Sequence, residues 1–156
     1  MFDYSIRRAA SADLSVISDH RQKMFSEMGQ PMDSACVASF ESWLKGALAT
    51  GLFQCWLAQT AEGAVVAGAG LTVIPWPPGP RDSTPRAAFI YNVYTEPEHR
   101  HRGLARRLMN ALHDWCRQQH ILTARLHAAD AGLRLYESLG YKATNEMMVM
   151  LDAKAE

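Results

Sequence analysis

The chain has 156 residues, of which 48% are hydrophobic, and its 16 basic side chains balance its 16 acidic ones. This length and composition fit one globular domain over residues 1–156 and exclude a disordered chain. A formal net charge of zero argues against a general nucleic-acid-binding protein, because such proteins carry a strong basic excess.

Cysteine and histidine usage also narrows the class of protein. Cys36, Cys55 and Cys116 are odd in number and lack C-x-x-C spacing, which predicts free buried thiols rather than disulfides or a zinc site. Free thiols are typical of a reducing cytoplasm. The histidines show no metal-ligand spacing, the start of the chain shows no signal-peptide pattern, and no apolar run approaches the roughly 18 residues of a membrane span. We therefore expect a cytoplasmic domain without a metal or a membrane partner.

Hydrophobic periodicity and turn signals predict a strand, two helices and a hairpin in the first half of the chain. The expected elements, in order, are a strand over 3–8, a helix from Ser11 or Asp13 to about Met28, a second helix from Asp33 or Ser34 to Gly51, and strands over 52–59 and 64–74. Serine and aspartate favour the N-cap of a helix, and glycine favours the left-handed residue that ends one.

The second half opens with a loop over 75–86 that is rich in proline and contains Trp76. The elements expected after it are a strand over 87–95, a helix over 103–118, a strand over 121–127, a helix over 130–140 that Asp130 can cap, and a final strand over 141–151. The single helix between the strands over 87–95 and 121–127 predicts that these two strands are parallel. We therefore predict a mixed α/β sheet with helices on its faces.

The segment Arg100-His101-Arg102-Gly103-Leu104-Ala105 lies between such a strand and helix. The first turn of a helix has backbone N–H groups without intrahelical partners, and these lie at the positive end of the helix dipole. A phosphate is a natural ligand there, and Gly103 lets the backbone approach it closely. A basic helix start on a solvated surface is the simpler alternative, and a nucleic-acid-binding helix is another.

This pattern, R-x-x-G-x-A, resembles the pyrophosphate-binding signature of the GNAT superfamily of N-acetyltransferases. The sequence Val93-Tyr94-Thr95-Glu96-Pro97-Glu98-His99-Arg100 is similar to the family's strand and its entry into that loop. Leu135-Tyr136-Glu137 and Leu139-Gly140-Tyr141 are similar to its last helix. The similarity spans nearly the whole chain.

The resemblance implies a mixed, mostly antiparallel sheet with a central, splayed parallel strand pair and about four flanking helices. It implies an acetyl-CoA-dependent N-acetyltransferase that works by direct attack of an amine on the thioester. The implied cofactor-binding residues are Val93, Tyr94, Thr95, Arg100, His101, Arg102, Gly103, Leu104 and Ala105. A backbone N–H of Val93 or Tyr94 would polarise the thioester carbonyl, and Tyr136 would protonate the leaving thiolate.

The general base stays open, because the strand over 87–95 lacks the carboxylate that many relatives carry there. A water relayed by Asn92, or a carboxylate such as Glu27 or Glu146, could take the proton. Ala129 also stands where relatives often carry a polar residue. An acyl-CoA-binding sensor or interaction module without turnover is therefore a second hypothesis.

The acceptor amine is expected to bind between the first two helices, the Trp76 loop and the last strand. Candidate lining residues are Arg21, Phe25, Glu27, Met28, Trp43, Trp76, Tyr91, Asn92 and Glu146. Aromatic side chains with a few acids suit a small amine or a peptide N-terminus, and both remain open. A homodimer also remains open.

Overall fold

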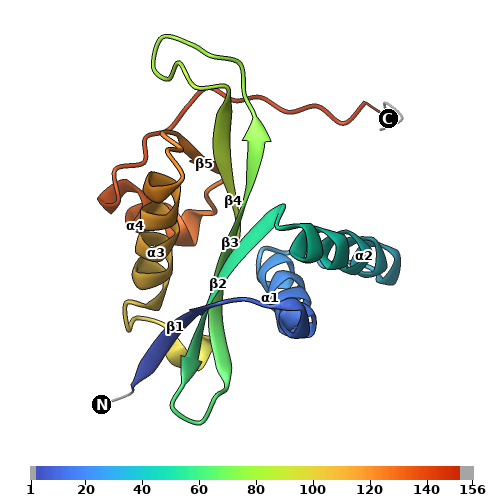
Figure 1. The fold of residues 1–156 in the computed structure, drawn as a ribbon. Helices are drawn as coiled ribbons and strands as arrows, with labels where there is room; N and C mark the ends of the chain where they lie inside the picture. The colour runs from blue at the N-terminus through green and yellow to red at the C-terminus, as the bar shows by residue number, and fades with distance from the viewer. Residues whose placement is uncertain (1–2, 152–156) are drawn as a thin grey trace.

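The computed structural model describes residues 3–151, which form one mixed sheet covered by helices on both faces (Figure 1). The sheet has five strands in the order β1-β2-β3-β4-β5. Their bounds are β1 Tyr4–Arg8, β2 Phe53–Thr60, β3 Val65–Pro75, β4 Arg86–Thr95 and β5 Ala124–Leu126. Neighbouring strands are antiparallel except β4 and β5, which are parallel as predicted.

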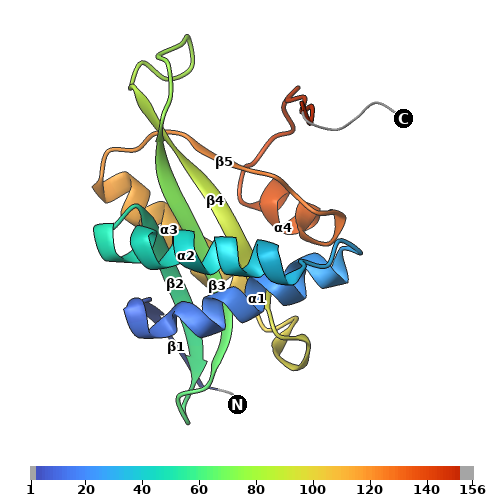
Figure 2. The ribbon, with the colours of Figure 1, turned by 90° about the vertical axis from the view of Figure 1, so that its right-hand side faces the viewer.

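Two pairs of helices lie on opposite faces of this sheet. Helices α1 (Leu14–Glu27) and α2 (Ser34–Thr50) cover one face, and Figure 2 looks onto them. Helices α3 (Leu104–Gln118) and α4 (Leu133–Ser138) lie on the other side of the sheet (Figure 1). Short 3-10 turns at Ser11–Asp13, Pro97–His99 and Asp130–Gly132 precede α1, α3 and α4. The predicted mixed sheet with flanking helices is confirmed.

Each face of the sheet has its own apolar core. On the α3 face, Leu104, Leu108 and Leu112 follow the helical repeat and are almost fully buried against the strands. On the α1 and α2 face, Leu44 packs with Leu57 and neighbouring side chains. These two cores hold the helices against the sheet, because burial of a leucine side chain contributes about 1.5–3 kcal/mol.

The predicted helix caps are confirmed for α2 and wrong for α1. The Asp33 side chain accepts the backbone N–H of Cys36, and Gly51 ends α2 in the left-handed conformation with φ of 74°. Asp13 precedes α1 but makes no capping bond to it. Its carboxylate instead binds the Arg7 guanidinium and accepts the Ala10 N–H, since the 3-10 turn places it beside β1.

Several predictions for the second half of the chain require correction. β5 is three residues long, and α4 covers six residues of the predicted helix over 130–140. Asp130 begins a 3-10 turn and does not cap α4. The predicted strand over 141–151 is wrong, because residues 141–150 lie outside regular structure. A strand needs a neighbour to pair with, and no strand of residues 3–151 pairs with this segment, whose apolar side chains such as Met147 and Leu151 are exposed.

Among residues 3–151, no helix is both long and apolar enough to cross a membrane. The prediction of buried thiols holds for Cys55 and Cys116, whereas Cys36 is exposed on α2.

Candidate active site

Strand β4 contains a β-bulge at its centre. Gly68 of β3 pairs with Tyr94, and Gly70 pairs with Tyr91, so that Asn92 and Val93 oppose one residue of β3. Asn92 has a φ of 53°, an uncommon conformation that asparagine tolerates better than most residues. Bulges redirect backbone and side-chain groups and are frequent beside functional sites.

The bulge also decides which backbone groups face the edge of β4 next to β5. The Ala88 N–H donates to the Thr123 carbonyl beside β5, whereas the Glu96 N–H donates to the Val66 carbonyl on β3. Successive residues of a strand point their backbone groups to opposite edges. The extra residue therefore reverses the alternation and directs the Val93 N–H away from β3.

That edge of β4 is open beyond Ile90. The parallel pair joins Ala88, Phe89 and Ile90 to β5 and extends no further, since β5 ends at Leu126. The parallel pair implied by the resemblance is confirmed, but it lies at the edge of the five-stranded sheet and not at its centre, because the described chain has no strand beyond β5. Unpaired backbone groups at a sheet edge can accept an extended ligand as an added strand. The amide groups of a pantetheine arm fit such an edge.

The loop before α3 presents its backbone rather than a capping side chain to the helix N-terminus. His101 and Gly103 both have left-handed conformations, with φ of 60° and 76°. No side chain within residues 3–151 caps α3 at Gly103. The N–H groups of the first turn, including those of Leu104 and Ala105, therefore form a site for an anionic group such as a pyrophosphate.

Two arginines of this loop, Arg100 and Arg102, bind neighbouring parts of the protein. The Arg100 Nη2 lies 2.8 Å from both Glu27 carboxylate oxygens, and its Nε donates to the Thr95 carbonyl. Arg102 donates to the Tyr4 hydroxyl and to a loop carbonyl. Both guanidinium groups therefore hold the loop against α1 and β1.

The Tyr94 side chain shares this ion pair. Its hydroxyl donates to the Glu27 carboxylate at 2.9 Å. Burial, together with this negative neighbour, raises the Tyr94 pKa to about 12. Glu27, proposed as a possible base, is thus already bound by two partners, and their hydrogen bonds lower its pKa although burial opposes this.

Tyr136 is buried on α4, in the same core as the first turn of α3. Its ring packs onto Gly132 so closely that a Cβ there would lie 2.7 Å from the ring. Burial raises the pKa of its phenol, so the hydroxyl stays protonated over the physiological range. This is the state in which a tyrosine can donate a proton.

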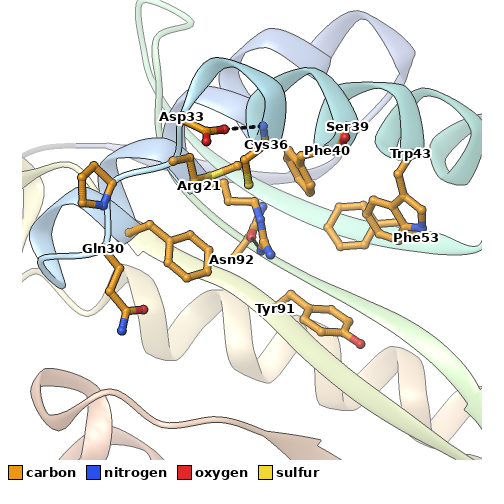
Figure 3. Close-up of a pocket in the computed structure, with 13 residues that line it drawn as sticks. Arg21, Gln30, Asp33, Cys36, Ser39, Phe40, Trp43, Phe53, Tyr91 and Asn92 are labelled. Carbon is orange, nitrogen blue, oxygen red and sulfur yellow. Dashed lines mark hydrogen bonds between the residues drawn. The ribbon is translucent and has the colours of Figure 1, made fainter. Parts of the chain in front are cut away.

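A pocket of about 630 Å³ lies between α1, α2 and the strands (Figure 3). Its wall carries five aromatic side chains: Phe25, Phe40, Trp43, Phe53 and Tyr91. Among the described residues that line it, Arg21 is the one guanidinium and Asp33 is the one carboxylate. Asn92 reaches the pocket from the bulge, so the pocket adjoins the open part of β4.

The structure brings some of the predicted acceptor residues together and separates others. The predicted residues that line the pocket are Arg21, Phe25, Trp43, Tyr91 and Asn92. The other predicted residues do not line the pocket. Glu27 pairs with Arg100, and Glu146 pairs with His127. Met28 is exposed at the end of α1, and the Trp76 ring stacks on Arg125 at 3.9 Å.

No sequence pattern predicted a place near the candidate site for His20, Phe40 or Phe53. His20 lies on α1 beside the Tyr94 ring and is 2% exposed, and burial lowers its pKa. Phe40 belongs to the apolar repeat of α2, which gave a usable signal for burial but none for a pocket. Phe53 lies on β2 and its ring contacts that of Trp43 on α2. No local sequence pattern predicts this contact between a strand and a helix.

Within the described part of the chain, no three histidine, cysteine or acidic side chains are grouped as metal ligands. Residues 14–141 match the acetyltransferase (GNAT) family. A comparison with curated proteins finds no match.

Solved structures support the same grouping. A GCN5-related N-acetyltransferase from Ralstonia eutropha JMP134 is 34% identical, with a TM-score of 0.87, over 96% of this chain and 99% of that one. A predicted acetyltransferase from Clostridium acetobutylicum, solved with acetyl-CoA, is 24% identical, with a TM-score of 0.86, over 95% and 96%. An aminoglycoside N-acetyltransferase in complex with CoA is 13% identical, with a TM-score of 0.74, over 99% and 97%. The last two show likeness of fold alone.

Proposed function

The chain belongs to the acetyltransferase (GNAT) family and is therefore an acyltransferase, and on this premise we propose that it acetylates the amine of a small molecule or peptide. The observation that carries the proposal is the bulge at Asn92, which joins the pocket to the open edge of β4. An amine bound in the pocket would thus meet a thioester bound along the strand.

The backbone groups supply binding and polarisation in this proposal. The loop from His101 to Ala105 holds the pyrophosphate of acetyl-CoA, and the edge from Val93 to Thr95 pairs with the pantetheine amides. The Val93 N–H, directed to that edge by the bulge, donates to the thioester carbonyl. A donor placed in this way typically lowers a barrier by about 3 kcal/mol.

The side chains complete the transfer. Asn92 positions the amine, whose nitrogen forms a bond to the acetyl carbon as the carbon–sulfur bond breaks. Tyr136 gives its phenolic proton to the departing sulfur and regains one from solvent. Among the described residues the pocket wall has a single carboxylate, Asp33, which caps α2, and we assign the proton lost by the amine to water.

A turnover assay tests this function. The full chain is mixed with acetyl-CoA and a panel of amines, free thiol is measured, and the acetylated product is identified by mass. Thiol release that depends on an amine supports the proposal. Binding of acetyl-CoA without thiol release from any amine would instead support the binding-module hypothesis.

A further inference from the structure

Arg21 is the positively charged side chain on the pocket wall. Its guanidinium lies 4.9 Å from the Phe25 ring centre and 4.7 Å from that of Phe40. The two rings contact the cation and restrict its access to water. This burial lowers the Arg21 pKa, as expected for a cation that has lost part of its hydration.

No carboxylate of residues 3–151 lies within 4.0 Å of the Arg21 guanidinium. Three other arginines of the described chain have such a partner: Arg7 pairs with Asp13, Arg100 with Glu27, and Arg117 with Asp114. A partly desolvated charge without a counterion is unfavourable unless a ligand supplies one.

Asn92 adds a second donor beside Arg21. Its Oδ1 accepts the Arg21 Nη1 at 2.6 Å, and an arginine can only donate, so the Oδ1 must face Arg21. The Nδ2 therefore points elsewhere. It is buried, in a side chain 6% exposed, and finds no hydrogen-bond acceptor within the described residues. An unsatisfied buried donor is rare and unfavourable.

These two donors need an acceptor-rich, negatively charged ligand group, and the aromatic wall needs an apolar one. We propose that the acceptor is a free α-amino acid with an apolar side chain, whose carboxylate binds Arg21 and Asn92 and whose side chain packs against the aromatic wall. This inference rests on the proposed acetyl transfer. In an α-amino acid one carbon separates the amine from the carboxyl group, so binding at Asn92 holds the amine beside the Val93 N–H.

The same charge argument disfavours two other classes of amine. A polyamine or an aminoglycoside would bring further positive charge to Arg21, which is repulsive in a partly desolvated site. A peptide N-terminus carries an amide where the free amino acid carries a carboxylate. It would leave the guanidinium without a counterion.

The experiment compares each amino acid with its own amide. L-leucine, L-methionine and L-phenylalanine are tested against the three corresponding amides, spermidine and a short peptide, with thiol release and product mass as readouts. Loss of a charge-assisted interaction predicts that kcat/KM falls by about 10- to 100-fold from acid to amide. Equal or faster turnover of the amides, the peptide or spermidine would overturn the inference while the acetyl transfer stands.

Two variants locate the effect. Arg21→Met should bring the ratio of acid to amide turnover close to one, with a smaller change in turnover of the amide itself. Arg117→Met makes the same change on the exposed end of α3 and should keep the wild-type ratio. A ratio unchanged in Arg21→Met contradicts the assignment of the carboxylate to that side chain.

If no amine releases thiol, the proposed function fails, and ligand binding then decides the inference separately. The melting temperature is measured with L-leucine and with its amide, each with CoA present. Stabilisation by the acid that disappears in Arg21→Met supports the carboxylate site. Equal stabilisation by both compounds, or none, rejects it.

Discussion

Glu27 and Arg100 join the two halves of the candidate site. The Arg100 Nη2 lies 2.8 Å from each oxygen of the Glu27 carboxylate. Glu27 is the last residue of α1, which lines the pocket, and Arg100 begins the loop that precedes α3. The ion pair therefore fixes the loop relative to the acceptor side of the molecule.

Removal of this charge should weaken cofactor binding more than it weakens the fold. We expect Glu27→Gln to raise the KM for acetyl-CoA several-fold, with little change in kcat, because the loop loses its anchor. A partly exposed pair contributes at most about 1 kcal/mol to stability, so the melting temperature should change little. Asp114→Asn breaks the exposed pair with Arg117 and serves as the control. A KM that responds equally to both substitutions would argue against a specific anchor.

The left-handed conformation of Gly103 gives a second prediction. Gly103→Ala should cost about 1 kcal/mol of folding stability from backbone strain, since space is open at its Cβ position. Gly140→Ala meets the same conditions, with φ of 92° and open space, far along the chain at the end of α4. Calorimetry should find weaker CoA binding in Gly103→Ala and unchanged binding in Gly140→Ala. Unchanged affinity in both would remove the loop from the cofactor site.

Tyr136 and Tyr141 form a matched pair for testing the acid. Their rings lie 5.8 Å apart, and the Tyr141 hydroxyl is bonded to His113 at 2.7 Å. Tyr136→Phe should lower kcat by about 100-fold while the KM for acetyl-CoA stays constant, a typical effect for loss of a proton donor. Tyr141→Phe should lower stability and leave kcat nearly unchanged. Equal kcat values for wild type and Tyr136→Phe would exclude Tyr136 as the acid.

Local sequence patterns correctly predicted those helix ends and turns that depend on interactions between neighbouring residues. Helix α2 begins after Asp33 and ends before Gly51, as expected, because capping depends on a few neighbouring residues. The strand–loop–helix around Gly103 was predicted for the same reason.

Long-range pairing explains what the sequence did not reveal. The bulge at Asn92 depends on how β4 registers against β3, and asparagine in a strand was its one local signal. The pocket combines Phe40 of α2 with Phe53 of β2, which the packing of α2 on the sheet brings to one wall. The segment over 141–151 has a strand-like apolar pattern, but no strand of the described chain pairs with it. A pattern can show that a segment suits a sheet without showing which edge receives it.

Burial of His20 predicts how stability depends on pH. Burial lowers the pKa of this side chain, although nearby Glu96 and Asp19 oppose the effect and Lys23 adds to it. Below about pH 6.5 the His20 side chain binds a proton in the unfolded chain but stays neutral in the folded chain. Stability should therefore fall as the pH drops below about 6.5, by up to about 1.4 kcal/mol per pH unit for each such histidine.

Denaturation at several pH values checks this. His20→Gln should have a shallower slope of unfolding free energy between pH 6.5 and about 5. Part of the slope should remain, because burial also lowers the pKa of His113. His120→Asn alters an exposed, left-handed position that asparagine tolerates, and it should keep the wild-type slope. Parallel curves for wild type and His20→Gln would contradict the neutral, buried state of His20.

A carboxylate at position 92 should do what we assign to the ligand. In Asn92→Asp the new group would lie beside the Arg21 guanidinium, whose Nη1 already touches the side chain of residue 92. The paired carboxyl should have a pKa below its value in the unfolded chain, so the gain in stability is present at pH 7 and is lost as the pH falls through about 4. With its cation neutralised, the pocket should lose its preference for acids, and the acid-to-amide ratio should fall at least about tenfold. If the variant gains no stability at pH 7 and still prefers the acid, the Arg21 guanidinium is not the group that binds the carboxylate of the ligand.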